Sequence, residues 1–392
     1  MKKIAKITVA LLLAVAMCFS LAGCYDEDLN WSAKYDDTEL PAGAYIYYLS
    51  IAYNEAASKV STEDEVLKSE IDGTPAETWI KDRANEYVNQ YFYIQSEMKR
   101  LGLEMTDEDY STCLQTTESY WNYFGTSFEK FGIAKTSFDI AYSQYNRMYL
   151  KVFNALYGEG GENEVPESEL RQHIEDDYYD YEYFSAPLTK TDDDNKSVDL
   201  TDEEKADLKE TLEKYKTKIE AGAMTVNDAA TDYALKVQQD STYQTGIKDE
   251  NGMQSSYMPD AFVSAIKEMK EDDVEVVEST KYMIVLHRLP IKDDEDTLLE
   301  SSDNRSQLLL ELKNTEYADA VSAAAQSFEG VEWNQKVLSR YKPSMFADSS
   351  KNGTSSVASE SSDSSASSEE SSAESSETSS ETSETSSESS AE

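Results

Sequence analysis

Apolar side chains recur every three or four residues along most of the chain, which is the spacing of one face of an amphipathic α-helix. A long helix is predicted to begin at Thr74-Pro75-Ala76-Glu77, because a Thr followed three residues later by a Glu forms a capping box. Thr106 and Thr201 mark two further starts, Gly102 marks an end and Gly125 predicts a turn. One side of the first of these helices carries Ile80, Ala84, Val88, Tyr91, Ile94 and Met98.

Three stretches are instead typical of β-strands. Tyr179–Pro187, Val274–Glu278 and Lys281–Leu286 are rich in aromatic and β-branched residues and are bounded by turn formers or Pro. Between the first and second stretch the pattern predicts three helices and a polar loop through Gly246 and Gly252. The expected fold is therefore mainly α, with one α+β module at residues 179–290 inserted into a helical domain.

The parts around the module are predicted to be helical. Residues 41–178 form the N-terminal part of the helical domain, and an acidic loop follows Pro290 up to Asp303. Residues 305–346 then form a helical segment that packs back on the N-terminal part. Residues 349–392 consist mostly of Ser, Glu, Thr and Ala, with no aromatic residue, and we expect a disordered tail there.

The N-terminus has the features of an export signal. Residues 1–23 combine Lys2, Lys3 and Lys6 with an apolar run that is too short to span a membrane comfortably. The following Leu21-Ala22-Gly23-Cys24 resembles a bacterial lipobox, in which the Cys is lipidated after cleavage. We expect Cys24 to anchor the protein at the outer face of the cell membrane, with residues 24–40 as a tether. The alternative is an ordinary secretory signal with a chance Cys. Within the tether, residues 25–37 leave a first short strand open as an alternative.

Charge and cysteine content exclude several classes of function. The net charge is −43, and loss of the three lysines of the signal leaves −46, which argues against a nucleic-acid partner. Of three cysteines, only Cys113 remains after processing and lipidation, so no internal disulfide can form. Cys113 lies on a helical apolar face, where an inert buried thiol is expected.

No metal or cofactor is expected. Asp192-Asp193-Asp194-Asn195 lacks the Gly and the distal Glu of a calcium-binding EF-hand. The chain has only two His residues, His173 and His287, and shows no zinc spacing, phosphate-binding loop or Ser-His-Asp set. An ordinary hydrolase mechanism is therefore hard to assemble.

Several motifs resemble one family of folding factors. Tyr282-Met283-Ile284-Val285 resembles the Tyr-His-Ile-Ile closing strand of parvulin-type prolyl isomerases, and Met258-Pro259-Asp260-Ala261-Phe262 resembles their Met-x-x-x-Phe step. Leu101-Gly102-Leu103, Phe131-Gly132-Ile133 and Val165-Pro166-Glu167 resemble the helical chaperone domain of PrsA- and SurA-type foldases. The resemblance covers roughly residues 28 to 346. It implies a SurA/PrsA-like helical chaperone domain with an inserted parvulin-like domain.

The chain departs from this family at its catalytic positions. The family uses two facing His side chains, but Met283 replaces one and either Glu182 or Tyr183 replaces the other. The Gly-rich loop of the family is also missing. His287 lies four residues beyond Met283, about 13 Å along a strand, and is not expected to substitute for the missing His.

The resemblance implies a membrane-anchored extracytoplasmic chaperone that binds unfolded or extended polypeptides, with prolyl isomerase activity weak or lost. Met258, Phe262, Tyr183 and Tyr282 are the expected substrate contacts, although the same residues can simply form the core of a small module. The sequence leaves two alternatives open. One is a surface lipoprotein that binds a single fixed protein partner, and the other is an active parvulin-type isomerase.

Overall fold

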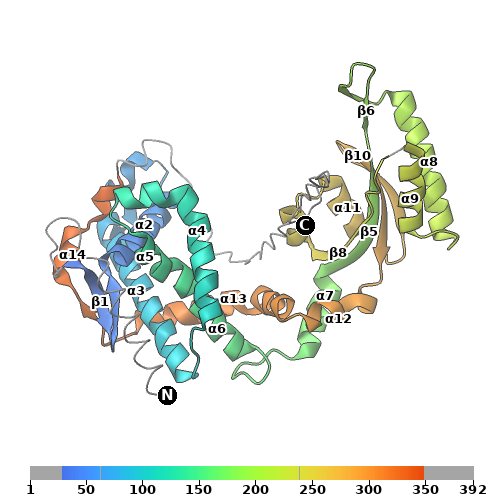
Figure 1. The fold of residues 1–392 in the computed structure, drawn as a ribbon. Helices are drawn as coiled ribbons and strands as arrows, with labels where there is room; N and C mark the ends of the chain where they lie inside the picture. The colour runs from blue at the N-terminus through green and yellow to red at the C-terminus, as the bar shows by residue number, and fades with distance from the viewer. Residues whose placement is uncertain (1–28, 62, 238, 348–392) are drawn as a thin grey trace, which may run out of the picture.

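The computed structural model describes residues 29–61, 63–237 and 239–347, and it divides them into two lobes (Figure 1). One lobe, the helical body, is built from residues before 158 and after 301. The other lobe, the module, is built around a four-stranded antiparallel sheet. The fold is mainly α with one α+β module, as the sequence predicts. The predicted signal peptide, the predicted lipidation site Cys24 and the Ser/Glu-rich tail lie outside the described residues.

The helical body is organised around α2 (Ala42–Ser58), which is buried on nearly every side because most of its residues are apolar. α3 (Ala76–Arg100) packs along it and buries the side predicted from the sequence, Ile80 and Val88 included. The remaining helical elements of this part are η2 (Glu63–Lys68), α4 (Asp107–Lys130), α5 (Lys135–Phe138), the π-helical η3 (Asp139–Gln144) and α6 (Tyr145–Tyr157).

Residues expected to be a tether form strands instead. β1 (Trp31–Tyr35) pairs with β2 (Thr38–Pro41) and with β11 (Glu332–Trp333) in an antiparallel sheet. The tether prediction fails here because Ala33 and Leu40 are fully buried against the body. Asn334 also donates from Nδ2 to the Trp31 carbonyl at 2.8 Å, so the two ends of the described chain are joined. α14 (Gln335–Arg340) and η4 (Pro343–Phe346) complete the body.

Two local predictions in the body are also wrong. Thr74–Pro75 forms the short strand β4, paired with β3 (Glu70–Ile71), and Pro75 precedes α3 without a side-chain cap. Gly125 lies inside α4, where the Trp121 ring covers it so closely that a Cβ atom would lie 2.6 Å from Nε1. Gly125 therefore permits a side-chain contact rather than a turn. The helix starts predicted at Thr106 and Thr201 are confirmed, and each has a capping box.

The sheet of the module has the order β8-β5-β10-β9. Alternate residues of its central strands enter two separate cores, because successive side chains of a strand point to opposite faces. α8 and α9 cover one face, with Phe184 and Val285, and α10 and α11 cover the other, with Tyr181 and Ile284. The elements are β5 (Tyr178–Pro187), β6 (Thr189–Thr191), β7 (Ser197–Asp199), α8 (Asp202–Glu220), α9 (Val226–Val237), β8 (Gln244–Asp249), α10 (Glu250–Ser255), α11 (Asp260–Glu268), β9 (Val274–Glu278) and β10 (Tyr282–Leu289).

Two segments predicted as loops are regular structure. The polar loop around Gly246 is the edge strand β8 followed by α10. The acidic loop after Pro290 is mostly α12 (Ile291–Glu300), which lies against α7 (Glu167–Asp177). Arg171 of α7 bonds Glu295 of α12 at 2.5 Å and Asp296 at 2.7 Å. The acidic run is thus held against α7, by these ion pairs and by the buried Ile291 at its start.

A single long helix, α13 (Ser302–Gln326), spans from the module side to the body (Figure 1). Its Tyr317 is 3% exposed and lies among the rings of Tyr149 and Phe153 on α6, at centroid distances of 4.6 and 5.3 Å. This aromatic cluster fixes the returning chain on the body. Among the described residues, none of the helices is long and apolar enough to cross a bilayer.

The Tyr317 hydroxyl is buried without a hydrogen-bond partner. We therefore expect Tyr317→Phe to leave the free energy of unfolding within about 0.5 kcal/mol of the wild type, or to raise it. Tyr317→Ala removes the whole ring and should cost about 3 kcal/mol or more. Urea unfolding followed by far-ultraviolet circular dichroism measures both. A Phe variant as unstable as the Ala variant would contradict this account.

Candidate functional site

The first candidate site is the face of the module that α11 covers. Phe262 of α11 lies against Tyr183 of β5, with ring centroids 5.1 Å apart, and Met258 is half-buried beside them. The Phe262 side chain is 0% exposed, so in this conformation it belongs to the core and offers no surface to a ligand. A substrate contact through Met258 or Tyr183 stays a prediction.

Tyr282, the fourth expected substrate contact, lies apart from Met258, Phe262 and Tyr183. It is 40% exposed at the start of β10 and lies opposite Pro187. Tyr183 lies opposite Leu286, four positions further along β10, which is a separation of about 13 Å along the strand. The four residues predicted to bind a proline segment therefore do not line one pocket.

The two family positions Glu182 and Met283 lie on the opposite face of the sheet from Phe262. Met283 is 1% exposed and packs with Phe184 and Val285 under α8 and α9. Glu182 is half-buried, and its Oε1 lies 2.8 Å from Nδ1 of His287, its cross-strand neighbour. As expected, His287 does not take the place of the His missing at Met283. It instead contacts Glu182, the residue at the other substituted position.

A third group completes this arrangement. The Tyr243 hydroxyl donates to Glu182 Oε2 at 2.9 Å. Burial raises the pKa of the Glu182 carboxyl, but the hydrogen bonds from His287 and Tyr243 outweigh it and leave the pKa below its usual value. Both oxygens of the carboxylate are therefore occupied. The sequence did not reveal this set because His287 meets Glu182 only through the register of β5 and β10.

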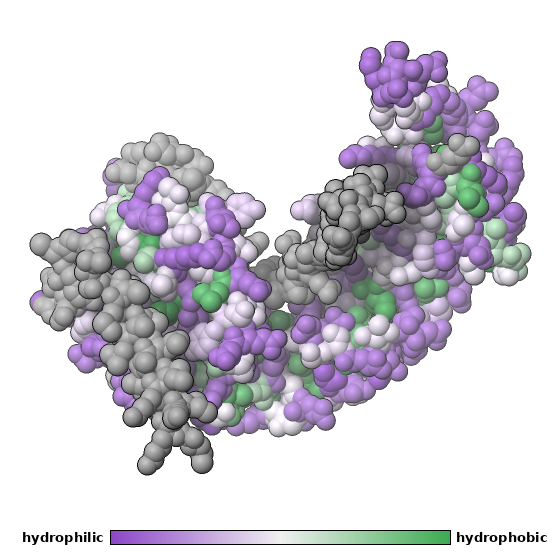
Figure 2. Space-filling model, in the orientation of Figure 1, coloured by the Kyte–Doolittle hydropathy of each residue, from purple (hydrophilic) through white to green (hydrophobic). Residues whose placement is uncertain are grey.

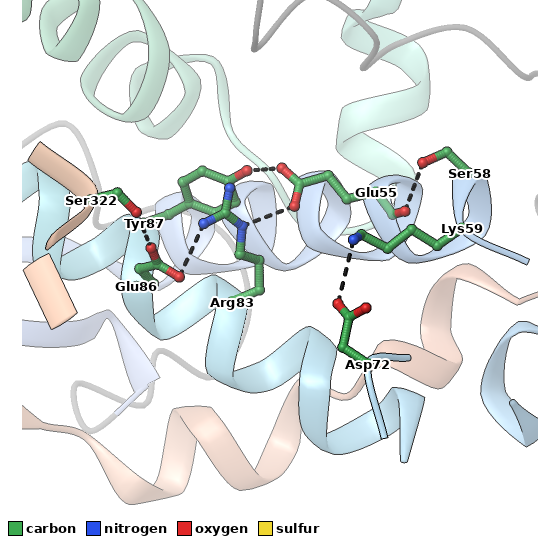
Figure 3. Close-up of polar contacts among 8 residues, drawn as sticks. All are labelled: Glu55, Ser58, Lys59, Asp72, Arg83, Glu86, Tyr87 and Ser322. Atoms are coloured by element: carbon green, nitrogen blue, oxygen red, sulfur yellow. Dashed lines mark hydrogen bonds and ion pairs between the residues drawn. The ribbon is translucent and has the colours of Figure 1, made fainter. Parts of the chain in front are cut away.

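A second candidate site is a polar cleft of about 520 Å³ on the body, between α2, α3 and the end of α13 (Figure 3). At its centre Arg83 bonds Glu55 at 2.9 Å and Glu86 at 3.0 Å. Tyr87 donates to Glu55, and Ser322 of α13 donates to Glu86 at 2.6 Å. The charged groups at its centre thus pair with one another between α2 and α3, and α13 joins them through the neutral Ser322. The cleft joins α13 to the body, and two carboxylates share its central guanidinium.

The chain shows no sign of a metal centre in the part that the structure describes, because no group of three or more His, Cys, Asp or Glu side chains is close enough to hold an ion. Cys113 is 2% exposed, and burial raises the pKa of its thiol to about 11. A protonated, enclosed thiol is a poor nucleophile, which agrees with the inert role expected from the sequence.

A third feature is the joint between the lobes. His173 of α7 lies with Nε2 2.9 Å from Glu311 of α13 and with Nδ1 2.8 Å from Asp177. Tyr178, the first residue of β5, donates to the same Glu311 carboxylate at 2.9 Å. The Glu311 bond raises the pKa of His173 further than burial lowers it. The helix that enters the module is thus tied to the helix that leaves it.

The two lobes enclose an open hollow. α4 borders it on the body side and α11 on the module side, and the space-filling view shows the space between them (Figures 1 and 2). α4 carries two exposed apolar residues one turn apart, Tyr110 at 46% and Leu114 at 57% exposure. Tyr257, just before α11, is 94% exposed. Exposed apolar side chains on facing elements are typical of an interaction surface.

Three solved structures are similar to this chain. Foldase protein PrsA from Streptococcus pneumoniae is 13% identical, with a TM-score of 0.35 over 69% of this chain and 94% of that one. PrsA from Lactococcus lactis is 13% identical, with a TM-score of 0.34 over 81% of this chain and 98% of that one. PrsA from Bacillus subtilis is 14% identical, with a TM-score of 0.29 over 71% of this chain and 93% of that one. The expected resemblance to PrsA is confirmed. No protein-family model and no curated protein matches the chain.

Restoring the family residue should not restore catalysis. In Met283→His the imidazole would lie in the apolar core under α8 and α9, on the far side of the sheet from Phe262, where it finds no hydrogen-bond partner in the apolar set described above. We expect a loss of about 2 kcal/mol or more in the free energy of unfolding and no gain in proline isomerisation of a test peptide. Met283→Leu, the matched control, should cost less than about 1.5 kcal/mol. A catalytic gain in the His variant would contradict the assignment of faces.

The joint should respond to pH through His173. Because its pKa is raised in the folded state, its contribution to stability is fully present below the ordinary pKa and is lost as the pH rises through the folded value. His173→Asn should therefore destabilise the protein more at about pH 5.5 than at about pH 9, as measured by urea unfolding. An equal loss at both pH values would show that the ionised pair contributes nothing.

Proposed function

We propose that this protein is a chaperone of the foldase type that holds unfolded or extended polypeptides in the hollow between the helical body and the module. Lipid at Cys24 anchors it at the outer face of the cell membrane. The observation that carries the proposal is that the elements on the two sides of the hollow carry exposed apolar residues, Tyr110 and Leu114 on α4 and Tyr257 just before α11. Weak apolar contacts of this kind suit many client sequences.

Prolyl isomerase activity is low in this proposal. Rotation about a peptide bond to Pro has a barrier of about 20 kcal/mol, and catalysis requires groups that stabilise the twisted amide better than the planar one. Here Met283 is part of a core, both oxygens of Glu182 are occupied, and Phe262 is enclosed. A polypeptide-holding role needs none of these positions.

The charge supports the same location and role. The net charge of −43 keeps complexes with clients soluble through mutual repulsion. Part of this charge belongs to the Ser/Glu-rich tail at residues 349–392. An acidic, lipid-anchored protein also stays away from an anionic bilayer surface, with its binding face directed to the solvent.

The test is suppression of aggregation, measured by light scattering when a chemically unfolded protein is diluted into buffer containing the chain from residue 25 onward. We expect suppression near one-to-one stoichiometry. The triple variant Tyr110→Ser, Leu114→Ser, Tyr257→Ser should need about ten times more protein, because loss of three partly buried apolar contacts costs about 1.4 kcal/mol or more. All three side chains are at least 46% exposed, so the fold should be retained.

The matched control is Tyr123→Ser with Leu235→Ser. These side chains are 83% and 75% exposed. Tyr123 follows Leu114 by nine residues on α4, which at about 100° per residue puts it on the opposite side of the helix, and Leu235 lies on α9, away from the hollow. We expect the control to behave as the wild type. A chain ending at residue 348 tests whether the acidic tail alone suppresses scattering. No suppression at several-fold excess would contradict the chaperone proposal and favour a single fixed partner, to be sought by pull-down from the cell envelope.

A further inference from the structure

The sheet of the module ends in a strand whose outer edge is unpaired. β9 follows β10 at the end of the order β8-β5-β10-β9. Within the described ranges, no other segment forms a backbone hydrogen bond to the outer side of residues 274–278. An exposed row of N–H and C=O groups is a template for another extended chain.

The register shows which groups point outward. The Ser279 N–H donates to the Tyr282 carbonyl at 2.8 Å, and the Arg288 N–H donates to the Asp273 carbonyl at 3.0 Å. Hydrogen-bonded pairs alternate along an antiparallel ladder, so residues 275 and 277 also bond toward β10. The backbone groups of Val274, Val276 and Glu278 therefore point away from the sheet.

Several of the usual protections of an edge are missing from β9. Natural proteins protect edge strands with Pro, charged side chains such as Lys, bulges, a short length or a covering segment, and of these β9 has its length of 5 residues and the charges of Glu275 and Glu278. Val274-Glu275-Val276-Val277-Glu278 contains neither Pro nor Lys, and its pairing with β10 has no shift in register. Its two faces are supported, by α8 on one side and α11 on the other, so the strand is held rigid while its edge stays open.

The other edge strand of the sheet differs. β8 contains Gly246, which weakens a strand, and Lys248. Its Ile247 packs against the core of the body, and α10 follows it directly. β8 is therefore partly covered and irregular in composition. It can serve as an internal control when binding at the edge of β9 is measured.

We infer that the β9 edge binds an extended segment of a client polypeptide as an additional antiparallel or parallel strand. This inference rests on the function proposed above and names how the client backbone is recognised. Glu275 and Glu278 are exposed beside the edge, so uncharged or basic segments are preferred. A second copy of this chain is disfavoured, because each copy carries a net charge of −43.

Recognition through the main chain suits a protein with many clients. Backbone hydrogen bonds are common to every sequence, and alternate side chains of the added strand add only a preference. The side chains of Val274 and Val276 already lie in the core against α8, so the client supplies its own apolar contacts. The hollow and the edge thus bind different features of an unfolded chain, its apolar side chains and its backbone.

The decisive variant is Val276→Pro in the chain from residue 25 onward. It removes an outward N–H and leaves the bonds between β9 and β10 in place, which is where Pro is tolerated in sheets. The probe is a labelled peptide of alternating Val and Thr with Lys at both ends, and its Kd is measured by fluorescence anisotropy. We expect Val276→Pro to weaken binding about tenfold, while Val276→Ala, which keeps the N–H, changes it less than about threefold. Equal affinities of the Pro variant and the wild type would overturn the inference.

A measurement on the wild-type chain covers the case in which the Pro variant unfolds. Amide hydrogen exchange at Val274, Val276 and Glu278 should slow at least tenfold when the peptide is added, while Thr245 of β8 should not change. Protection of β8 alone, or protection of β9 that depends on protein concentration without peptide, would overturn the proposal in favour of the other edge or of a second copy. The hollow is tested separately, since the Tyr110, Leu114 and Tyr257 variants leave β9 intact.

Discussion

The returning helix α13 is the constraint on which the two lobes depend. The chain leaves the body after α6, builds the whole module, and comes back through α12 and α13. Near its start α13 bonds the entering segment through Glu311, and near its end it is buried in the body through Tyr317 and Val321. Without these contacts the module would be attached to the body only by single stretches of chain, and the hollow would have no defined width.

The polar cleft in Figure 3 belongs to the same constraint. Ser322 and the Ala325 carbonyl of α13 are held by Glu86 and Asn89 of α3, and Arg83 forms ion pairs with both Glu86 and Glu55. Partly buried charges stabilise a contact when each has a partner of good geometry. The cleft therefore orients α13 on α3, while the aromatic cluster around Tyr317 adds apolar contacts with α6.

The sequence predicted the elements whose pattern is local. β5, β9 and β10 were expected because runs of aromatic and β-branched residues are rarely helical, and the capping boxes at Thr106 and Thr201 located two helix starts. β8 was missed because only Ile247 in it is apolar, and its partner β5 lies some sixty residues away. α12 was missed because Arg171, which compensates its charge, lies in another helix. The Glu182–His287 contact likewise depends on strand register, which no local pattern contains.

The module begins and ends at neighbouring positions. Asp180, near the start of β5, lies directly opposite Leu289, the last residue of β10. The module therefore leaves and rejoins the rest of the chain at neighbouring points, as a short loop would. The pairing of β5 with β10 already holds these two points together, so inserting the module adds little loop-closure entropy to the folding of the body. A lineage of such proteins can lose, exchange or duplicate this cassette without redesigning the helical body. Substitutions inside the module, at positions such as Glu182 and Met283, are equally free of consequence for the body, because these side chains contact only other parts of the module.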